Sequence, residues 1–405
     1  MSAVAAEAEP LYNPLSPRFR VDPYPDLRRL RERDPVHWSP SGYCWILSRY
    51  QDIKSVLGDK RFEIALDRLM QIPALVPLFA EPYNQIIKTQ LLSSDPPDHT
   101  RIRAILGRAV SSARLEAGRA LIQRVVSGLI DEARSRGGLD LIADFAHRLP
   151  FTVICEMLSI PESERMPLVD WTHHMMRTTD PTPMSAHETA QTNAAACGFR
   201  DFFLAMAERY RRNPQDDFFN ELVVAQDSGK LTPEEFVANL ILLFCAGHDT
   251  VINLFGNGLL ALHRSPRQLE ILQEEPALIK SAVEELLRYD TSVTIARRTA
   301  LEDLELGGRS IREGQYVLCL LNAGNRDPEV FADPDRLDVR RTNVKPLSFG
   351  GGIHYCLGAQ LARIEGEIGL TALLTQLPTL QLATLEPEWK QNVFVRGLVS
   401  LPATL

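Results

Sequence analysis

The sequence lacks the cysteine spacings that most cysteine-based sites require. Six cysteines are scattered over 405 residues, and no two of them form a Cys-x-x-Cys pair. Neither a zinc site nor a disulfide framework fits that distribution. Five of the six lie among apolar neighbours and are expected to be small buried hydrophobic residues. Cys356 differs because it lies in a glycine-rich segment, and that context requires its own explanation.

The sequence also has little that would bind a membrane or a nucleic acid. Its longest notable apolar run, Leu240–Ala246, is far shorter than the roughly 20 residues of a membrane span. Met1–Pro10 shows neither the basic region nor the apolar region of a secretory signal. Lys and Arg total 44 against 52 Asp and Glu, so the net charge is −8. We therefore expect a soluble cytoplasmic protein that binds no nucleic acid and no membrane.

No internal repeat, low-complexity tract or linker-like stretch divides the chain. We therefore predict one domain over residues 1–405, with residues 1–20 a flexible tail at its start. Patterns typical of β-strands are few and short, and the remaining sequence is predominantly helical in pattern. The expected strands span residues 36–38, 43–48, 293–299, 315–320 and 393–396.

The clearest predicted helix begins with a capping box, in which Thr232 is the N-cap and Glu235 follows three residues later. Helix-compatible sequence continues to about Arg264, where Ser265-Pro266 ends it. Such a helix is on the order of 48 Å long. Because it is apolar around most of its middle, it must cross the protein interior. Further helices are predicted over residues 279–289 and from about Cys356 to Gln376.

The segment Phe349–Gly358 contains the unusual cysteine. Its glycines allow a close backbone path, and Cys356 is expected at the start of a helix, where the dipole favours thiolate over thiol. Such a thiolate is either a nucleophile or a metal ligand, and His354 is poorly placed to be the general base that a nucleophile needs. On residue types alone, a buried cysteine beside a flexible turn remains an open alternative.

The segment Ala246–Thr250 lies midway along the long predicted helix. A glycine inside a helix costs about 1 kcal/mol, so Gly247 calls for a reason. Thr250 can donate its hydroxyl to the carbonyl of Ala246 and bend the helix. Taken alone, the segment could equally be a tolerated kink in a buried helix.

The spacing Phe-x-x-Gly-x-x-x-Cys-x-Gly in Phe349–Gly358 resembles the haem-binding loop of the cytochrome P450 family. The resemblance implies that Cys356 is the proximal iron ligand, whose thiolate pushes electron density toward O–O cleavage. It further implies that Phe349 shields the sulfur and that His354 contacts a haem propionate. Gly352 and Gly358 would allow the close path of the loop.

Ala246–Thr250 resembles the oxygen-binding groove of the same family at all four fixed positions. By that resemblance Asp249 and Thr250 are the catalytic residues, which deliver protons through water during oxygen activation. Ala246 and Gly247 would lie against the haem, and Gly247 would leave room for dioxygen.

Basic residues for the two haem propionates follow from the same resemblance. His99 and Arg103 share one face of a helix after Asp95-Pro96-Pro97-Asp98, and we expect both to contact the haem. Arg298, in the strand ending at Thr299, matches the arginine that meets the other propionate. Arg297 points to the opposite side of that strand, and physical reasoning does not choose between the two arginines.

Glu285-Leu286-Leu287-Arg288 resembles the structural Glu-x-x-Arg motif of the family. A pair at this spacing is ordinarily worth a few tenths of a kcal/mol on a helix surface. Here the resemblance implies a buried pair behind the cysteine loop, and Arg336, in Pro334–Leu337, is expected to be its third partner.

These blocks follow the family's order, and the resemblance covers roughly residues 22–405. It implies a prism-shaped fold, mainly α with a small β-rich side (α+β), and one haem b (iron protoporphyrin IX) per chain. The expected protein is a bacterial monomer that inserts one oxygen atom of dioxygen into an apolar small molecule, by hydroxylation or epoxidation. A peroxygenase that uses hydrogen peroxide and a non-catalytic haem sensor are the alternatives, and the Asp249–Thr250 pair argues against the first.

The resemblance also suggests substrate and partner. The pocket would lie under the loop of residues 63–93, beside Leu242, Leu243, Val293–Ile295 and Phe394, and its aliphatic lining favours a terpenoid, macrolide or fatty-acyl substrate. The expected apolar side chains of that loop are Leu66, Leu69, Met70, Ile72, Leu75, Val76, Leu78 and Phe79. Electrons would come from a ferredoxin or flavodoxin, steered to the cysteine loop by four basic residues: Arg340, Arg341, Lys345 and Arg363.

Overall fold

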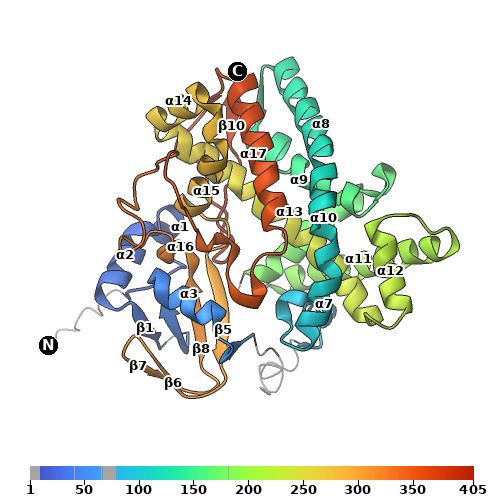
Figure 1. The fold of residues 1–405 in the computed structure, drawn as a ribbon, viewed down its shortest axis with the longest axis horizontal. Coiled ribbons are helices and arrows are strands. Elements are labelled where there is room, and N and C mark those ends of the chain that lie inside the picture. Colours follow the sequence, from blue (N-terminus) through green and yellow to red (C-terminus); the bar gives the residue numbers. More distant parts are fainter. Residues whose placement is uncertain (1–9, 41, 65, 67–78, 181) are drawn as a thin grey trace.

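A computed structural model describes residues 10–40, 42–64, 66, 79–180 and 182–405. Helices make up most of this part of the chain (Figure 1). The longer ones are α2 (Tyr24–Arg33), α3 (Tyr50–Gly58), α7 (Asp98–Leu106), α8 (Ser112–Arg136), α9 (Arg148–Met157), α10 (Met166–Met176), α11 (Ala186–Arg212), α12 (Phe218–Asp227), α13 (Pro233–His263), α14 (Pro266–Glu274), α15 (Ile279–Tyr289) and α17 (Ala359–Gln376). The short ones are α1 (Pro17–Val21), α6 (Pro82–Ile87) and α16 (Leu321–Gly324).

The strands form three small sheets. The largest has the order β1-β2-β8-β5-β3, in which β2 and β8 are parallel and the other pairs antiparallel. Its strands are β1 (Val36–Ser39), β2 (Cys44–Leu47), β8 (Tyr316–Leu320), β5 (Ile295–Ala300) and β3 (Phe62–Glu63). The others are β4 (Gly138–Asp140) with β10 (Pro402–Thr404) and β9 (Gln381–Leu382), and the hairpin β6 (Leu304–Leu306) with β7 (Arg309–Ile311). The prediction of a mainly α fold with a β-rich side is confirmed (Figure 1).

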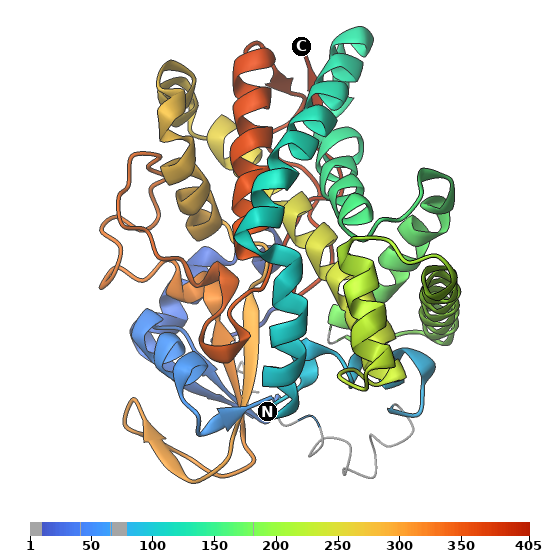
Figure 2. The same cartoon turned by 45° about the vertical axis from the view of Figure 1, so that its right-hand side comes forward.

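Helix α13 crosses the interior as predicted. The hydroxyl of Thr232 accepts from the Glu235 amide, and the Glu235 carboxylate accepts from the Thr232 amide. The helix packs against α9, α11, α15 and α17 (Figure 2). It is long and apolar enough to span a membrane, contrary to our reading of a short apolar run. However, 67% of its most apolar stretch is buried inside the protein, as in the core helix of a folded domain.

Glycines let α17 approach α13 closely. A β-carbon at Gly369 would lie 2.6 Å from the Phe255 ring, and one at Gly366 would lie 3.0 Å from Leu254. Any larger residue would push the two helices apart, because packed side chains leave no room to retreat. The close contact holds the start of α17, and therefore the cysteine loop, in a fixed position against the long helix.

Two expectations about the fold are wrong. Residues 11–20 are not a loose tail, because Pro17–Val21 form α1 and the ring of Tyr12 packs on Phe19 with centroids 5.6 Å apart. Residues 393–396 form no strand, and this segment contributes only an isolated bridge between Val395 and Val293. Both segments instead lie against each other, so apolar contact between distant parts of the chain replaces the local patterns.

Candidate active site

The cysteine loop takes a path that only glycine permits. Gly350 and Gly352 have φ angles of 68° and 64°, in the left-handed region that other residues rarely adopt. A β-carbon at Gly352 would also lie 1.9 Å from the carbonyl oxygen of Leu57 in α3. The Cys356 amide donates to the carbonyl of Phe349 at 2.9 Å. The loop therefore presents the cysteine at a defined place, just before α17 begins.

The thiol of Cys356 is not activated in the way that we predicted. Burial raises its pKa, and this effect outweighs the Gly358 amide, Arg103 and Arg363, which all lower it. A metal cation bound to the sulfur would supply the missing stabilisation, because coordination deprotonates a thiol.

Phe349 begins the cysteine loop, and its shielding of the sulfur stays a prediction. Its ring packs under the guanidinium of Arg363 at 4.4 Å and near the ring of Tyr355 at 6.2 Å. Arg363 is itself ion-paired with Glu284. The aromatic ring and the paired guanidinium together cover one side of the loop.

Four basic side chains gather near the cysteine. The rings of His99 and His354 lie 4.5 Å apart, Arg103 donates to the Tyr355 carbonyl at 2.7 Å, and Arg298 is 5% exposed. Burial, then Arg298, His99 and Arg103, lower the pKa of His354 to about 3, and its Nε2 is buried without a hydrogen-bond partner among the described residues. Within the described chain, none of the four makes an ion pair with a carboxylate.

This arrangement fits the haem that the sequence led us to expect. In the described part of the chain, no three His, Cys, Asp or Glu side chains come together as a metal cage. A metal held by Cys356 would therefore take its other ligands from a macrocycle. Four basic groups that make no ion pair with a described carboxylate suit an anionic group such as a pair of propionates, because buried charges require partners.

The middle of α13 points three consecutive side chains in different directions. Thr250 donates to the Ala246 carbonyl at 3.1 Å, so the predicted hydrogen bond is confirmed. Asp249 accepts from Lys390 Nζ at 3.2 Å. His248 is buried against His147, with Nε2 3.1 Å from that residue's carbonyl, and burial lowers its pKa to about 3. Sequence reasoning missed Lys390, since only the folded chain brings it to the helix.

The Glu-x-x-Arg pair is fully buried, with both side chains 0% exposed and Arg288 Nε 2.7 Å from Glu285. Its third partner is Arg341, whose Nε lies 3.1 Å from Glu285. The expectation that Arg336 fills this role is wrong: its side chain is 67% exposed and pairs with Asp338. Only the backbone carbonyl of Arg336 takes part, by accepting from Arg288 and Arg341.

The expected substrate walls are only partly described. Leu242 and Leu243 pack against the apolar cluster of α10, α11 and α13, and Phe394 packs beside the β5 strand. Of the loop over residues 63–93, residues 65 and 67–78 lie outside the described residues, and so do the expected Leu69, Met70, Ile72, Leu75, Val76 and Leu78.

A cysteine on a glycine loop, a basic cluster beside it and a long helix with an Asp-Thr pair define a haem-thiolate protein. The family model described as Cytochrome P450 matches residues 37–395. The polyketide biosynthesis cytochrome P450 PksS of Bacillus subtilis (strain 168) is 35% identical over 98% of this chain and 98% of that protein. Nocardicin C N-oxygenase of Nocardia uniformis subsp. tsuyamanensis is 36% identical over 96% and 98%.

Solved structures agree. CalO2 aligns with a TM-score of 0.91 and 33% identity, over 97% of this chain and 98% of that one. P450BioI, solved in complex with hexadec-9Z-enoic acid ligated acyl carrier protein, aligns with a TM-score of 0.89 and 33% identity, over 96% and 100%. The chain belongs to the cytochrome P450 family. It is a haem-thiolate monooxygenase, and the family implies haem iron as its cofactor.

Proposed function

We propose that this protein is a cytoplasmic, monomeric monooxygenase that binds one haem b through Cys356 and oxidises a bulky apolar small molecule. The reaction would be hydroxylation or epoxidation, with electrons from a ferredoxin or flavodoxin. The observation that carries the proposal is the cysteine on its glycine loop beside four basic side chains that make no ion pair with a carboxylate among the described residues.

The basic cluster would hold the propionates. His99 and Arg103 lie near His354 of the cysteine loop. Arg298, on β5, lies close enough to both histidines to lower their pKa values. The guanidinium of Arg297 instead packs 5.8 Å from the Tyr316 ring. This difference favours Arg298 over Arg297 as the second propionate ligand.

When bound, a haem with a thiolate ligand supplies the reduction and cleavage of dioxygen. Residues of α13 would deliver the protons that this reaction consumes. The Thr250 hydroxyl, which donates to the Ala246 carbonyl, can give up that hydrogen bond to a water molecule. The Asp249 carboxylate, next along the helix and 17% exposed, would pass protons to the Thr250 hydroxyl through water. An acid linked to bulk solvent beside a hydroxyl held by the helix is a suitable proton relay.

The relatives support an apolar substrate. PksS is named for polyketide biosynthesis, and P450BioI was solved with a fatty-acyl carrier protein. A third relative is the 6-deoxyerythronolide B hydroxylase of Saccharopolyspora erythraea, at 34% identity. Together with the apolar packing of Leu242, Leu243 and Phe394, these names favour a polyketide-like, terpenoid or fatty-acyl substrate. A spectral screen of such compounds against small benzoates would test this, and tight binding confined to the benzoates would contradict it.

The electron donor would dock over the cysteine loop. The four basic residues expected to attract it contribute less free positive charge than the sequence suggested. Arg341 is half-buried and ion-paired with Glu285, and Arg340 and Arg363 are ion-paired with Glu275 and Glu284. Lys345 is exposed and makes no ion pair within the described chain. Charge steering would therefore rest mainly on Lys345.

The carbon monoxide complex of the reduced protein tests the iron ligand. A thiolate ligand gives a long-wavelength Soret band, and Cys356→His should abolish that band even if haem stays bound. Retention of the band in this variant would refute the assignment of Cys356.

The Thr250→Ala variant tests the proton relay. Without the hydroxyl, electrons should be consumed with less product and more hydrogen peroxide. If product per electron stays at the wild-type value, Thr250 only bends the helix. Turnover with hydrogen peroxide in place of electrons, at the full rate, would favour the peroxygenase alternative.

A further inference from the structure

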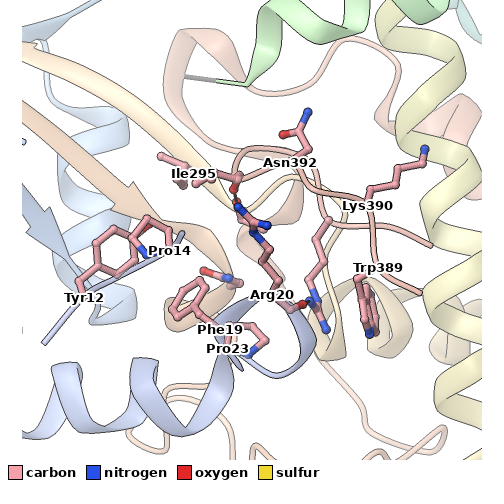
Figure 3. Close-up of a pocket in the computed structure, with 13 residues that line it drawn as sticks. Tyr12, Pro14, Phe19, Arg20, Pro23, Ile295, Trp389, Lys390 and Asn392 are labelled. Atoms are coloured by element: carbon pink, nitrogen blue, oxygen red, sulfur yellow. Dashed lines mark hydrogen bonds between the residues drawn. The ribbon is translucent and has the colours of Figure 1, made fainter. Parts of the chain in front are cut away.

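A small pocket opens between the N-terminal segment and the segment before β10 (Figure 3). We call the second segment, residues 389–396, the C-terminal segment. The pocket is lined by Tyr12, Pro14, Phe19, Arg20, Pro23, Thr294, Ile295, Asn322, Trp389, Lys390, Asn392, Val393 and Arg396. No residue of the cysteine loop or of the basic cluster beside it is among the described residues that line it.

The pocket is positively charged in a chain of net charge −8. Its described lining residues include Arg20, Lys390 and Arg396, and no aspartate or glutamate is among them. Lys390 is neutralised by Asp249, and Arg396 by Asp290 at 2.8 Å. Arg20 therefore supplies the excess charge.

Arg20 has no partner for its charge among the described residues. Its backbone carbonyl accepts from Arg396 at 2.6 Å, but its side chain makes no ion pair in the described chain, and its buried Nε lacks a hydrogen-bond partner there. Figure 3 shows the side chain extending from α1 toward Ile295. A buried N–H without a partner costs free energy unless a ligand or water satisfies it.

The walls around Arg20 are largely aromatic. Tyr12 and Phe19 form one side, and Trp389, under the Arg396 guanidinium at 3.5 Å, belongs to the other. Aromatic rings favour contact with apolar groups, while a guanidinium pairs with a carboxylate through two parallel hydrogen bonds. Both features belong to one kind of ligand: an amphipathic carboxylate.

We propose that this pocket binds the carboxylate of an amphipathic small molecule, with Arg20 as its anchor. Such a molecule could be the substrate itself or a separate ligand, and the chemistry of recognition is the same. The pocket shares Thr294 and Ile295 with the segment expected to wall the substrate site, and its lining residue Val393 precedes Phe394, another expected wall residue. It also contains Lys390, the partner of Asp249.

Isothermal titration calorimetry of the haem-loaded protein tests the proposal. The probes are decanoate and 4-phenylbutanoate, each compared with its primary amide, which has the same body without the charge. At least one acid should bind more tightly than its amide. Arg20→Gln should weaken the acid by roughly 10- to 100-fold, the value of a charged hydrogen bond, and leave the amide unchanged.

Arg18→Gln is the matched control. Arg18 lies on the same short helix, but it is exposed, pairs with Asp26 and does not line the pocket. Equal binding of acid and amide, or equal loss in the Arg18 and Arg20 variants, would overturn the proposal. An unchanged melting temperature of Arg20→Gln would show that the loss of binding is not a loss of folding.

The haem spectrum separates the two sources of ligand. An acid that binds, shifts the haem to high spin and is oxidised is a substrate, and an acid that binds without these effects is a separate ligand; both results support the pocket. The carbon monoxide band, measured on the same samples, reports the thiolate ligand independently. Failure of the pocket and failure of the proposed function are therefore distinguishable.

Discussion

Replacing Arg341 should destabilise the protein far more than replacing Arg336, although the sequence suggested the reverse. Arg341 donates through Nε to the fully buried carboxylate of Glu285 at 3.1 Å and to the carbonyl of Ala332 at 2.7 Å. Glu285 also retains Arg288, so the change would weaken a buried charge cluster without leaving a bare charge.

The size of the effect follows from these contacts. One hydrogen bond to a buried charge is worth roughly 1.5–3 kcal/mol, and a carbonyl that water can reach adds about 1 kcal/mol or less. We therefore expect Arg341→Met to cost about 3 kcal/mol. At roughly 2.1 cal/mol/K per residue, the unfolding entropy is on the order of 0.85 kcal/mol/K for 405 residues. The melting temperature should then fall by about 3–4 °C.

Differential scanning calorimetry of the haem-loaded protein measures this fall at one scan rate. Arg336→Ala is the control, because its exposed pair with Asp338 should be worth less than about 1 kcal/mol. Equal shifts for the two variants, or a larger shift for the Arg336 variant, would refute the assignment of Arg341 as the third partner.

Three further predictions concern charge. Lys390→Met should release the Asp249 carboxylate and lower product formed per electron, and Lys390→Arg should restore it; an unchanged ratio in Lys390→Met would show that the pair has no role in proton delivery. Burial lowers the pKa of His248 to about 3, so its imidazole stays neutral in the folded state. The unfolded chain takes up a proton below about pH 6.5, so the stability of the fold decreases as the pH is lowered, by up to ~1.4 kcal/mol per pH unit. His248→Gln should flatten that fall between pH 6.5 and 4.5 in a melting series, and an unchanged slope would contradict it. Reduction of the protein by a ferredoxin should depend only weakly on ionic strength, and a steep fall with salt would show that more basic residues than Lys345 steer the donor.

Features with a local signal were predictable from the sequence. The Thr232 cap and the proline stop at 266 bound α13, and the predicted helix over residues 279–289 coincides with α15. The hydrogen bond from Thr250 to Ala246 also depends only on helical spacing. Each of these rests on residues within a few positions of one another, where backbone geometry fixes the contact.

Features that depend on long-range contact were not predictable. Arg336 and Arg341 lie five residues apart on the same irregular segment, and no periodicity says which one turns inward to Glu285. The raised pKa of Cys356 likewise depends on desolvation of the thiol by parts of the chain that lie far away in sequence. Helix position alone gave the opposite direction.

The C-terminal segment shows what such contacts can do. It is irregular, yet it contacts four distant parts of the chain. Lys390 pairs with Asp249, and the side-chain amide of Asn392 donates to the Thr179 hydroxyl. The Thr294 hydroxyl donates to the Val393 carbonyl. Arg396 closes the set by donating to the carbonyls of α1. None of these residues belongs to the cysteine loop or the basic cluster. Substitutions here can therefore change the shape of the pocket and the surroundings of Asp249 while the residues expected to hold the haem stay unchanged. An irregular segment whose strand pairing is limited to isolated bridges tolerates such change better than a helix of the core.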